Sequence, residues 1–150
     1  YVDSLTYAQN RNHFNEYIEK NRRKELHSVG VIYLDLNGLK EINDKMGHLA
    51  GDTLIISASY VLQEIFADNS YRIGGDEFVV IEQDVLESEF MSKYNKLLVR
   101  MKELEISVAT GYIWKERCLN LSEILQAADQ KMYEDKKRYY SIAQKDRRRR

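Results

Sequence analysis

Residues 71–81 constrain the fold more than any other stretch, because they have the pattern of a β-hairpin that carries two carboxylates at its turn. Two runs rich in β-branched and aromatic residues flank Gly74-Gly75, and a glycine pair between such runs is typical of a tight turn. Asp76 and Glu77 follow where the second strand would begin. A charged turn facing water is the simple interpretation of these two residues. A functional interpretation requires a second polar group close by.

Asp35 is such a group, because it directly follows an apolar run over residues 29–34 that is typical of a strand buried on both faces. A carboxylate in that place costs free energy unless it is solvated, paired or bound to a cation. If the hairpin lies beside this strand, Asp76 and Glu77 come close to Asp35. Oxygen ligands of this kind suit Mg²⁺ or Mn²⁺, which accept a few carboxylates and let substrate phosphates complete the coordination.

The stretch after Asp35 indicates a phosphate cradle at the start of a short helix over residues 39–46. Backbone N–H groups of Gly38 and Leu39 at a helix start are suited to bind phosphate. Lys40 adds a positive charge there, although an ordinary exposed helix lysine is the simpler interpretation of that residue alone. We expect Leu39, Ile42 and Met46 to face inward.

The remaining pattern predicts helices packed on a mixed, largely antiparallel sheet, an α/β (α+β) sandwich. Residues 3–6 supply polar capping groups before the first helix. Residues 47–52 form a glycine-bounded break. Apolar side chains recur at helical spacing around residues 14–18, 54–66, 90–101 and 120–133, and alternate as in a strand over 105–114.

Length and composition predict one domain over residues 1–146, followed by a basic tail or the start of a linker at 147–150. The chain has 150 residues, of which 31% are charged, and it contains no proline. Its single Cys118 excludes an internal disulfide and agrees with a reducing compartment. With a net charge of −1, the chain has no overall electrostatic field that would attract it to a nucleic-acid polymer or a membrane. No apolar run approaches the ~18 residues needed to cross a bilayer.

Taken together, these stretches resemble the GGDEF family of diguanylate cyclases. The motif that names the family stands at residues 74–78, and residues 35–44 are similar to its D-x-D-x-F-K-x-x-N-D motif. Gly47-His48 and Gly51-Asp52 follow at the family's spacing. The opening at 3–11 and the stretch 128–136 are similar to the family's first and last motifs. Five motifs in the family's order cover essentially the whole chain.

The resemblance implies a palm-like nucleotide cyclase fold and a nucleotidyltransferase of bacterial signalling. Its activity would be condensation of two GTP molecules into cyclic di-GMP plus two pyrophosphates. It further implies a Mg²⁺ or Mn²⁺ cofactor and a homodimer in which each subunit holds one GTP. The domain would be cytoplasmic, without membrane contact of its own, within a longer protein that has an adjoining sensory or dimerisation domain.

The resemblance also implies roles for individual residues. The metal ions would be bound by Asp35, the carbonyl of Leu36, and Asp76. The triphosphate would be held by the amides of Gly38 and Leu39 together with Lys40 and Lys136. Guanine would be recognised by Asn43 and Asp52, with His48 close to the nucleotide. Either Asp76 or Glu77 would help to deprotonate the attacking ribose 3′-hydroxyl, and Lys40 would stabilise charge in the transition state.

Four departures from the family pattern leave alternatives open. Asn37 replaces the second aspartate of D-x-D, Leu39 replaces a phenylalanine, and Tyr7 replaces the glycine of the opening loop. Residues 139–141, Tyr-Tyr-Ser, stand where the family has Gly-Arg-Asn, so the arginine expected to assist Lys136 is missing. One alternative is a degenerate domain that binds GTP or cyclic di-GMP as a regulatory module without turnover. Another is a related palm-type cyclase or polymerase that uses another base.

Overall fold

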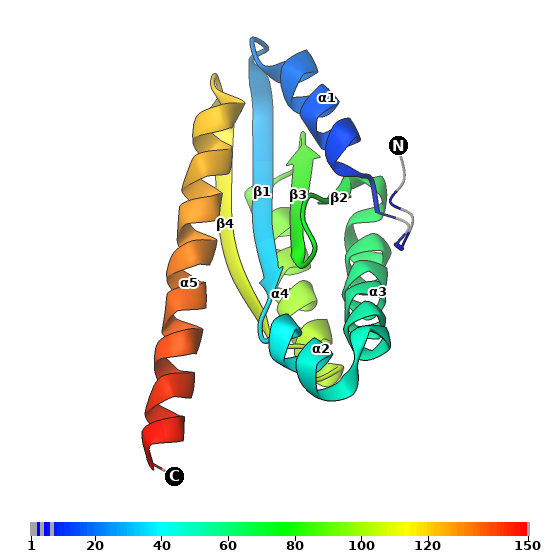
Figure 1. Ribbon diagram of the computed structural model, residues 1–150. Helices are drawn as coiled ribbons and strands as arrows, with labels where there is room; N and C mark the ends of the chain where they lie inside the picture. The colour runs from blue at the N-terminus through cyan, green and yellow to red at the C-terminus, as the bar shows by residue number, and fades with distance from the viewer. Residues whose placement is uncertain (1–2, 4, 7, 150) are drawn as a thin grey trace.

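The computed structural model describes residues 3, 5–6 and 8–149, with side chains up to residue 145. Ser4 of the predicted capping stretch and residue 150 of the predicted tail lie outside the described residues. Figure 1 shows a sheet with helices packed along it. The elements are α1 (Arg11–Asn21), β1 (Leu26–Leu36), α2 (Leu39–Met46), α3 (His48–Phe66), the 3₁₀ turn η1 (Ala67–Asn69), β2 (Ser70–Arg72), β3 (Glu77–Gln83), α4 (Glu87–Glu103), β4 (Val108–Cys118) and α5 (Leu121–Arg149).

The sheet has the strand order β2-β3-β1-β4, and each neighbouring pair is antiparallel. This confirms the predicted hairpin, since β2 pairs with β3, and it confirms that the hairpin lies beside the strand that contains Asp35. A single parallel bridge, between Gln9 and Tyr71, is found outside the strands of the described chain. The predicted class, a largely antiparallel sheet flanked by helices, is therefore correct.

Two hydrophobic layers enclose the sheet, and β1 contributes to both. Ile32 and Leu34 pack with residues of α3 and α4, whereas Val31 and Tyr33 pack with residues of α1 and α5. Helices α1 and α5 thus cover one face and α3 and α4 the other (Figure 1). Coverage of both faces explains why β1 is apolar almost without interruption.

Gly111 of β4 determines how closely α5 approaches the sheet. A side chain at this position would collide with the backbone of Ala128 and Met132 in α5. Glycine removes that obstacle, because it has no Cβ atom. The close contact holds α5 alongside β4, and α5 then passes the end of β1, where Lys136 reaches Asp35.

Several local predictions were wrong in detail. Gly47 alone separates α2 from α3, with φ at 87°, so Gly51 and Asp52 lie inside α3 rather than in a break. Met46 is 73% exposed instead of facing inward, and it is the last residue of α2, a helix with no fully buried residue. The last strand is also displaced, since β4 begins at Val108 and ends at Cys118.

The start of the chain differs from expectation as well. Asn10 caps α1 through its side-chain oxygen, which accepts from the backbone N–H of His13; Asp3 forms a separate turn. Helix α5 continues through Arg149, so its last residues belong to the predicted basic tail at 147–150, and the domain boundary after residue 146 stays a prediction. Within the described part of the chain, none of the helices combines the length and apolarity that a bilayer crossing requires.

Candidate functional site

Three carboxylates meet where β1 ends and β3 begins. Asp35 lies directly opposite Glu77 in the antiparallel register. Leu36, the last residue of β1, donates its backbone N–H to the carbonyl of Asp76 at 2.9 Å. Antiparallel pairing brings the end of one strand to the start of the other, so the sequence-distant residues Asp35, Asp76 and Glu77 form one cluster.

Asp35 is the most buried of these acids, at 5% exposure. Its Oδ2 accepts a hydrogen bond from Lys136 Nζ at 2.8 Å. Its Oδ1 is buried and has no hydrogen-bond partner among the described residues. Burial raises the pKa of Asp35 to about 6, a shift that Lys136 opposes and the neighbouring carboxyl of Asp76 reinforces. The site therefore contains one buried, unsatisfied acceptor oxygen, which a hydrogen-bond donor or a cation would stabilise.

Helix α5 contributes one cation and one further acid to the cluster. Burial is the largest single influence on the pKa of Lys136 and lowers it, but the hydrogen bond to Asp35 and the negative charges of Asp35 and Asp76 together outweigh burial, so the pKa is raised overall. Burial raises the pKa of Asp129. The pKa of Glu77 is raised by burial and then by the charges of Asp129 and Asp35. No role was predicted for Asp129, although its spacing of seven residues from Lys136 in the sequence indicates that both lie on the same helix face.

A pocket of about 780 Å³ opens beside this cluster and has Asp35, Asp129, Tyr133 and Lys136 among its lining residues. Within the part of the chain that the structure describes, no group of three or more His, Cys, Asp or Glu side chains is arranged to hold a metal ion. Magnesium needs fewer protein ligands than that, because it keeps several waters and is commonly bound through one or two carboxylates plus substrate phosphates. The unpartnered Oδ1 of Asp35 beside Asp76 fits such a cation.

The predicted phosphate cradle adjoins the end of β1. Gly38 has φ at 70° and stands at the N-cap of α2, without a side-chain cap. This left-handed conformation is readily adopted by glycine, and the first N–H groups of a helix have no partner within it. Leu39 is half-buried and Lys40 is exposed at this helix start. Asn37 anchors the turn, since its Nδ2 donates to Ser107 Oγ at 3.1 Å.

Asn43 and Asp52, which were predicted to recognise guanine, and His48, which was predicted to lie close to the nucleotide, are on α2 and α3. Asn43 packs against Gly51, where an added Cβ would collide with its amide, and its buried Oδ1 has no partner among the described residues. Asp52 is half-buried and His48 is exposed. No hydrogen bond or ion pair found within the described residues joins these side chains to the carboxylate cluster. They are polar residues on α2 and α3, separate in sequence and in element from the carboxylate cluster at the ends of β1 and β3.

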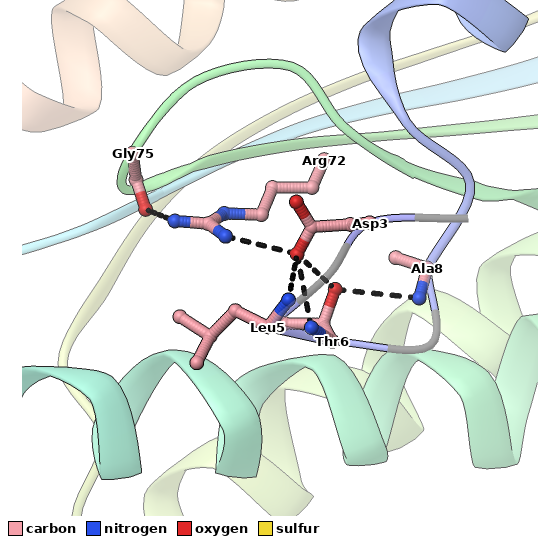
Figure 2. A network of polar contacts seen from close by, with 6 residues as sticks. All are labelled: Asp3, Leu5, Thr6, Ala8, Arg72 and Gly75. Atoms are coloured by element: carbon pink, nitrogen blue, oxygen red, sulfur yellow. Dashed lines mark hydrogen bonds and ion pairs between the residues drawn. The ribbon is translucent and has the colours of Figure 1, made fainter. Parts of the chain in front are cut away.

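A polar network ties the opening of the chain to the glycine turn, as Figure 2 shows. The Asp3 carboxylate accepts hydrogen bonds from the backbone of Leu5 and Thr6 at 3.2 and 2.9 Å, and from Arg72 Nη1 at 2.9 Å. Arg72 Nη2 donates to the carbonyl of Gly75 at 3.0 Å. Burial raises the pKa of Asp3, yet these hydrogen bonds outweigh it and lower the pKa overall. The network supports the turn that presents Asp76.

Neither glycine of that turn, Gly74 or Gly75, adopts the left-handed backbone conformation that a glycine pair often provides in tight turns. Among the described glycines, only Gly38 and Gly47 have positive φ. A side chain at Gly75 would meet open space, and one at Gly74 would only touch Glu77 at ordinary contact distance. The pair therefore leaves the backbone accessible from outside, rather than supplying a left-handed turn.

Comparison with known proteins gives a family match that covers most of the chain. The family described as "Diguanylate cyclase, GGDEF domain" matches residues 1–140. The signalling protein YkoW of Bacillus subtilis is 35% identical, over 95% of this chain and 21% of that protein. The cyclic di-GMP phosphodiesterase PdeR of Escherichia coli is 30% identical, over 88% of this chain and 22% of that protein. The chain thus spans about a fifth of the length of both relatives.

A solved structure shares the fold. The GGDEF domain of DgcB from Caulobacter crescentus, crystallised with c-di-GMP, superposes with a TM-score of 0.76 at 21% identity. The match covers 91% of this chain and 90% of that one. The four-stranded sheet and its flanking helices are therefore the architecture of a GGDEF domain.

Proposed function

The chain belongs to the GGDEF-domain family of diguanylate cyclases, and we propose that it condenses two GTP molecules into cyclic di-GMP with release of two pyrophosphates. The observation that carries the proposal is the buried Asp35, whose Oδ1 lacks a partner beside Asp76, Glu77 and Lys136. A carboxylate held in this way costs stability and provides no packing advantage, which favours a role with a bound cation.

Asp35, Asp76 and the carbonyl of Leu36 would hold Mg²⁺ or Mn²⁺, which when bound neutralises phosphate charge. The amides of Gly38 and Leu39, with Lys40 and Lys136, would bind the triphosphate. Transfer of a phosphoryl-type group depends mainly on positioning and on neutralising charge, and these residues supply both.

Asn43 and Asp52 would recognise guanine, with His48 close to the nucleotide. A carboxylate at Asp52 accepts hydrogen bonds from the ring N–H and amino group of guanine, whereas adenine presents an unprotonated ring nitrogen there. The half-buried position of Asp52 on α3 makes an unpaired acceptor costly. We therefore expect preference for GTP over ATP.

A carboxylate at the hairpin would accept the proton of the attacking 3′-hydroxyl. In each of two steps, a ribose 3′-oxygen attacks the α-phosphorus of the other GTP, the new P–O bond forms, and pyrophosphate leaves. Asp76 and Glu77 are the candidates, and the raised pKa of Glu77 favours it as a proton acceptor near neutral pH. Because both nucleotides react in the same way, two chains, each holding one GTP, would form the active unit.

One observation favours a second function, a regulatory domain that binds nucleotide without turnover. Tyr139 and Tyr140 occupy the positions of the glycine and the phosphate-binding arginine of the family pattern. Loss of that guanidinium removes a bidentate, charge-assisted contact. Measurement of turnover separates this function from the cyclase.

The test uses the chain fused to a dimerising coiled coil, with GTP and Mg²⁺, and quantifies cyclic di-GMP by chromatography. We expect product from GTP and little from ATP. Asp76→Ala should lower the rate ~10²-fold or more, while Glu116→Ala, an exposed carboxylate on β4, should not. Turnover by Asp76→Ala at the parent rate would refute the site. GTP binding without product from the parent dimer would identify the regulatory module.

A further inference from the structure

Tyr139 of α5 reaches the start of α2. Its hydroxyl lies 3.5 Å from the point where a Cβ atom on Gly38 would stand. Tyr139 and Gly38 both line a pocket of about 250 Å³, together with Asn37 and Ser107. Within the described residues, the Tyr139 hydroxyl makes no hydrogen bond. A half-buried donor is therefore available at the predicted phosphate cradle.

The geometry of α5 explains why this hydroxyl lies there. Tyr139 follows Lys136 by three residues, and side chains at that spacing share one helix face. Lys136 reaches Asp35 at the end of β1, and Tyr139 reaches Gly38 three residues further along the turn. The Tyr140 ring packs edge-on against Tyr139, with centroids 5.2 Å apart at 78°, which restricts the Tyr139 side chain.

The charges around the pocket indicate where a phosphate could lie. Glu41 and Glu105 line the pocket together with Lys45, so its charged side chains do not favour an anion. The groups near Gly38 that suit a phosphate are the backbone N–H groups of the helix start. Asn37, 5% exposed, adds a buried Oδ1 without a partner among the described residues to the wall of this pocket.

We propose that Tyr139 positions the nucleotide by donating a hydrogen bond from its hydroxyl to the outer phosphates, beside the amides of Gly38 and Leu39. This rests on the proposed function and assigns a residue to its triphosphate site. A hydroxyl is a neutral donor, so it orients a phosphate oxygen without the full charge of a guanidinium. Tyr140 stands at the position of the family's arginine, and Tyr139, at the preceding glycine position, supplies a different donor one position earlier on α5.

The test compares Tyr139→Phe with the parent chain, because phenylalanine keeps the ring and removes only the donor. Tyr60→Phe serves as the control, since Tyr60 is 69% exposed on α3. Calorimetry with Mg²⁺ measures binding of GMP and of a GTP analogue with a methylene bridge between its α- and β-phosphorus atoms. Loss of one hydrogen bond to a charged group should weaken binding of the analogue about tenfold. GMP binding should be unchanged, and Tyr60→Phe should match the parent.

Equal affinity of parent and Tyr139→Phe for the analogue would overturn the inference, as would an equal loss for GMP or a lower melting temperature of the variant. Tyr139→Arg, which restores donors, should recover binding of the analogue, and failure to recover it would also count against the inference. A parent chain that binds neither nucleotide would refute the proposed function itself, which distinguishes the two failures.

Discussion

Burial of the Asp35 carboxylate costs the folded, metal-free protein stability. The pKa of Asp35 in the folded chain is about 6, above its ordinary value of 3.8. Between these pH values the folded chain binds more protons than the unfolded one, so the free energy of unfolding falls as pH rises. The difference of 6 − 3.8 = 2.2 units corresponds to roughly 3 kcal/mol.

Urea denaturation in a chelator, at pH 4 and at pH 7, measures this cost. Asparagine at position 35 does not titrate, so the stability of Asp35→Asn relative to the parent should rise by roughly 2 kcal/mol between the two pH values, because part of the full shift already lies below pH 4. Groups that titrate equally in both proteins cancel in the comparison. A stability difference between parent and variant that is independent of pH would contradict the assigned pKa.

Asp3 and Arg72 form a partly buried ion pair, with side chains 20% and 15% exposed. We expect a double-mutant cycle with Asp3→Asn and Arg72→Gln to give a coupling energy of about 1–2 kcal/mol, because charge-assisted hydrogen bonds are strong when shielded from water. The pair Glu25–Arg117, with side chains 53% and 74% exposed, is the control, and its coupling should be below about 1 kcal/mol. Equal coupling in both cycles would show that the network of Figure 2 does not stabilise the turn.

The contact between β4 and α5 depends on one glycine. Gly111→Ala would push a methyl group into the backbone of Ala128 and Met132, which has no flexible end to move aside. We expect the free energy of unfolding to fall by roughly 1–3 kcal/mol or more, as for other overpacked sites. Displacement of α5 would also move Lys136 away from Asp35, so nucleotide affinity should fall.

Gly75→Ala is the matched control, because a Cβ atom there meets open space. Its melting temperature should equal that of the parent within error. If Gly111→Ala had the same melting temperature as the parent, the contact at Gly111 would not be what holds α5 against β4.

Element boundaries show where local patterns were insufficient. The stripe from Leu54 to Phe66 predicted α3, but its start at His48 was missed, because glycines at positions 47 and 51 indicated a break. Gly51 instead provides room for Asn43 between two packed helices. In the sequence, a glycine that bends the backbone cannot be distinguished from one that makes room for a neighbouring side chain.

Two chains must meet for the proposed reaction, because each would supply one of the two GTP molecules. We expect cyclic di-GMP formed per chain by the unfused protein to rise with protein concentration, by mass action on the dimer. The coiled-coil fusion should lose this dependence. Activity per chain that stays constant over a hundredfold dilution of the unfused protein would argue against a homodimer that dissociates in this range.

Periodicity and motif order alone predicted a largely antiparallel sheet, its hairpin and the family, whereas the place of the hairpin beside the Asp35 strand was only a condition that the fold then met. These features are encoded locally, since alternation, helical stripes and turn residues act over a few positions. The roles of Asp35, Asp76 and Lys136 were likewise assigned from their positions in the family's motifs, and they stay predictions until tested.

Only the tertiary structure decided which side chains meet across the molecule. Three features depend on how α5 lies against β4. They are the surroundings of the unpartnered Asp35 Oδ1, the effect of the Asp129 charge on the pKa of Glu77, and the approach of Tyr139 to Gly38. That placement arises from a close contact at Gly111, between residues distant in sequence. Contacts of this kind follow from packing of the whole chain, so no local pattern indicates them.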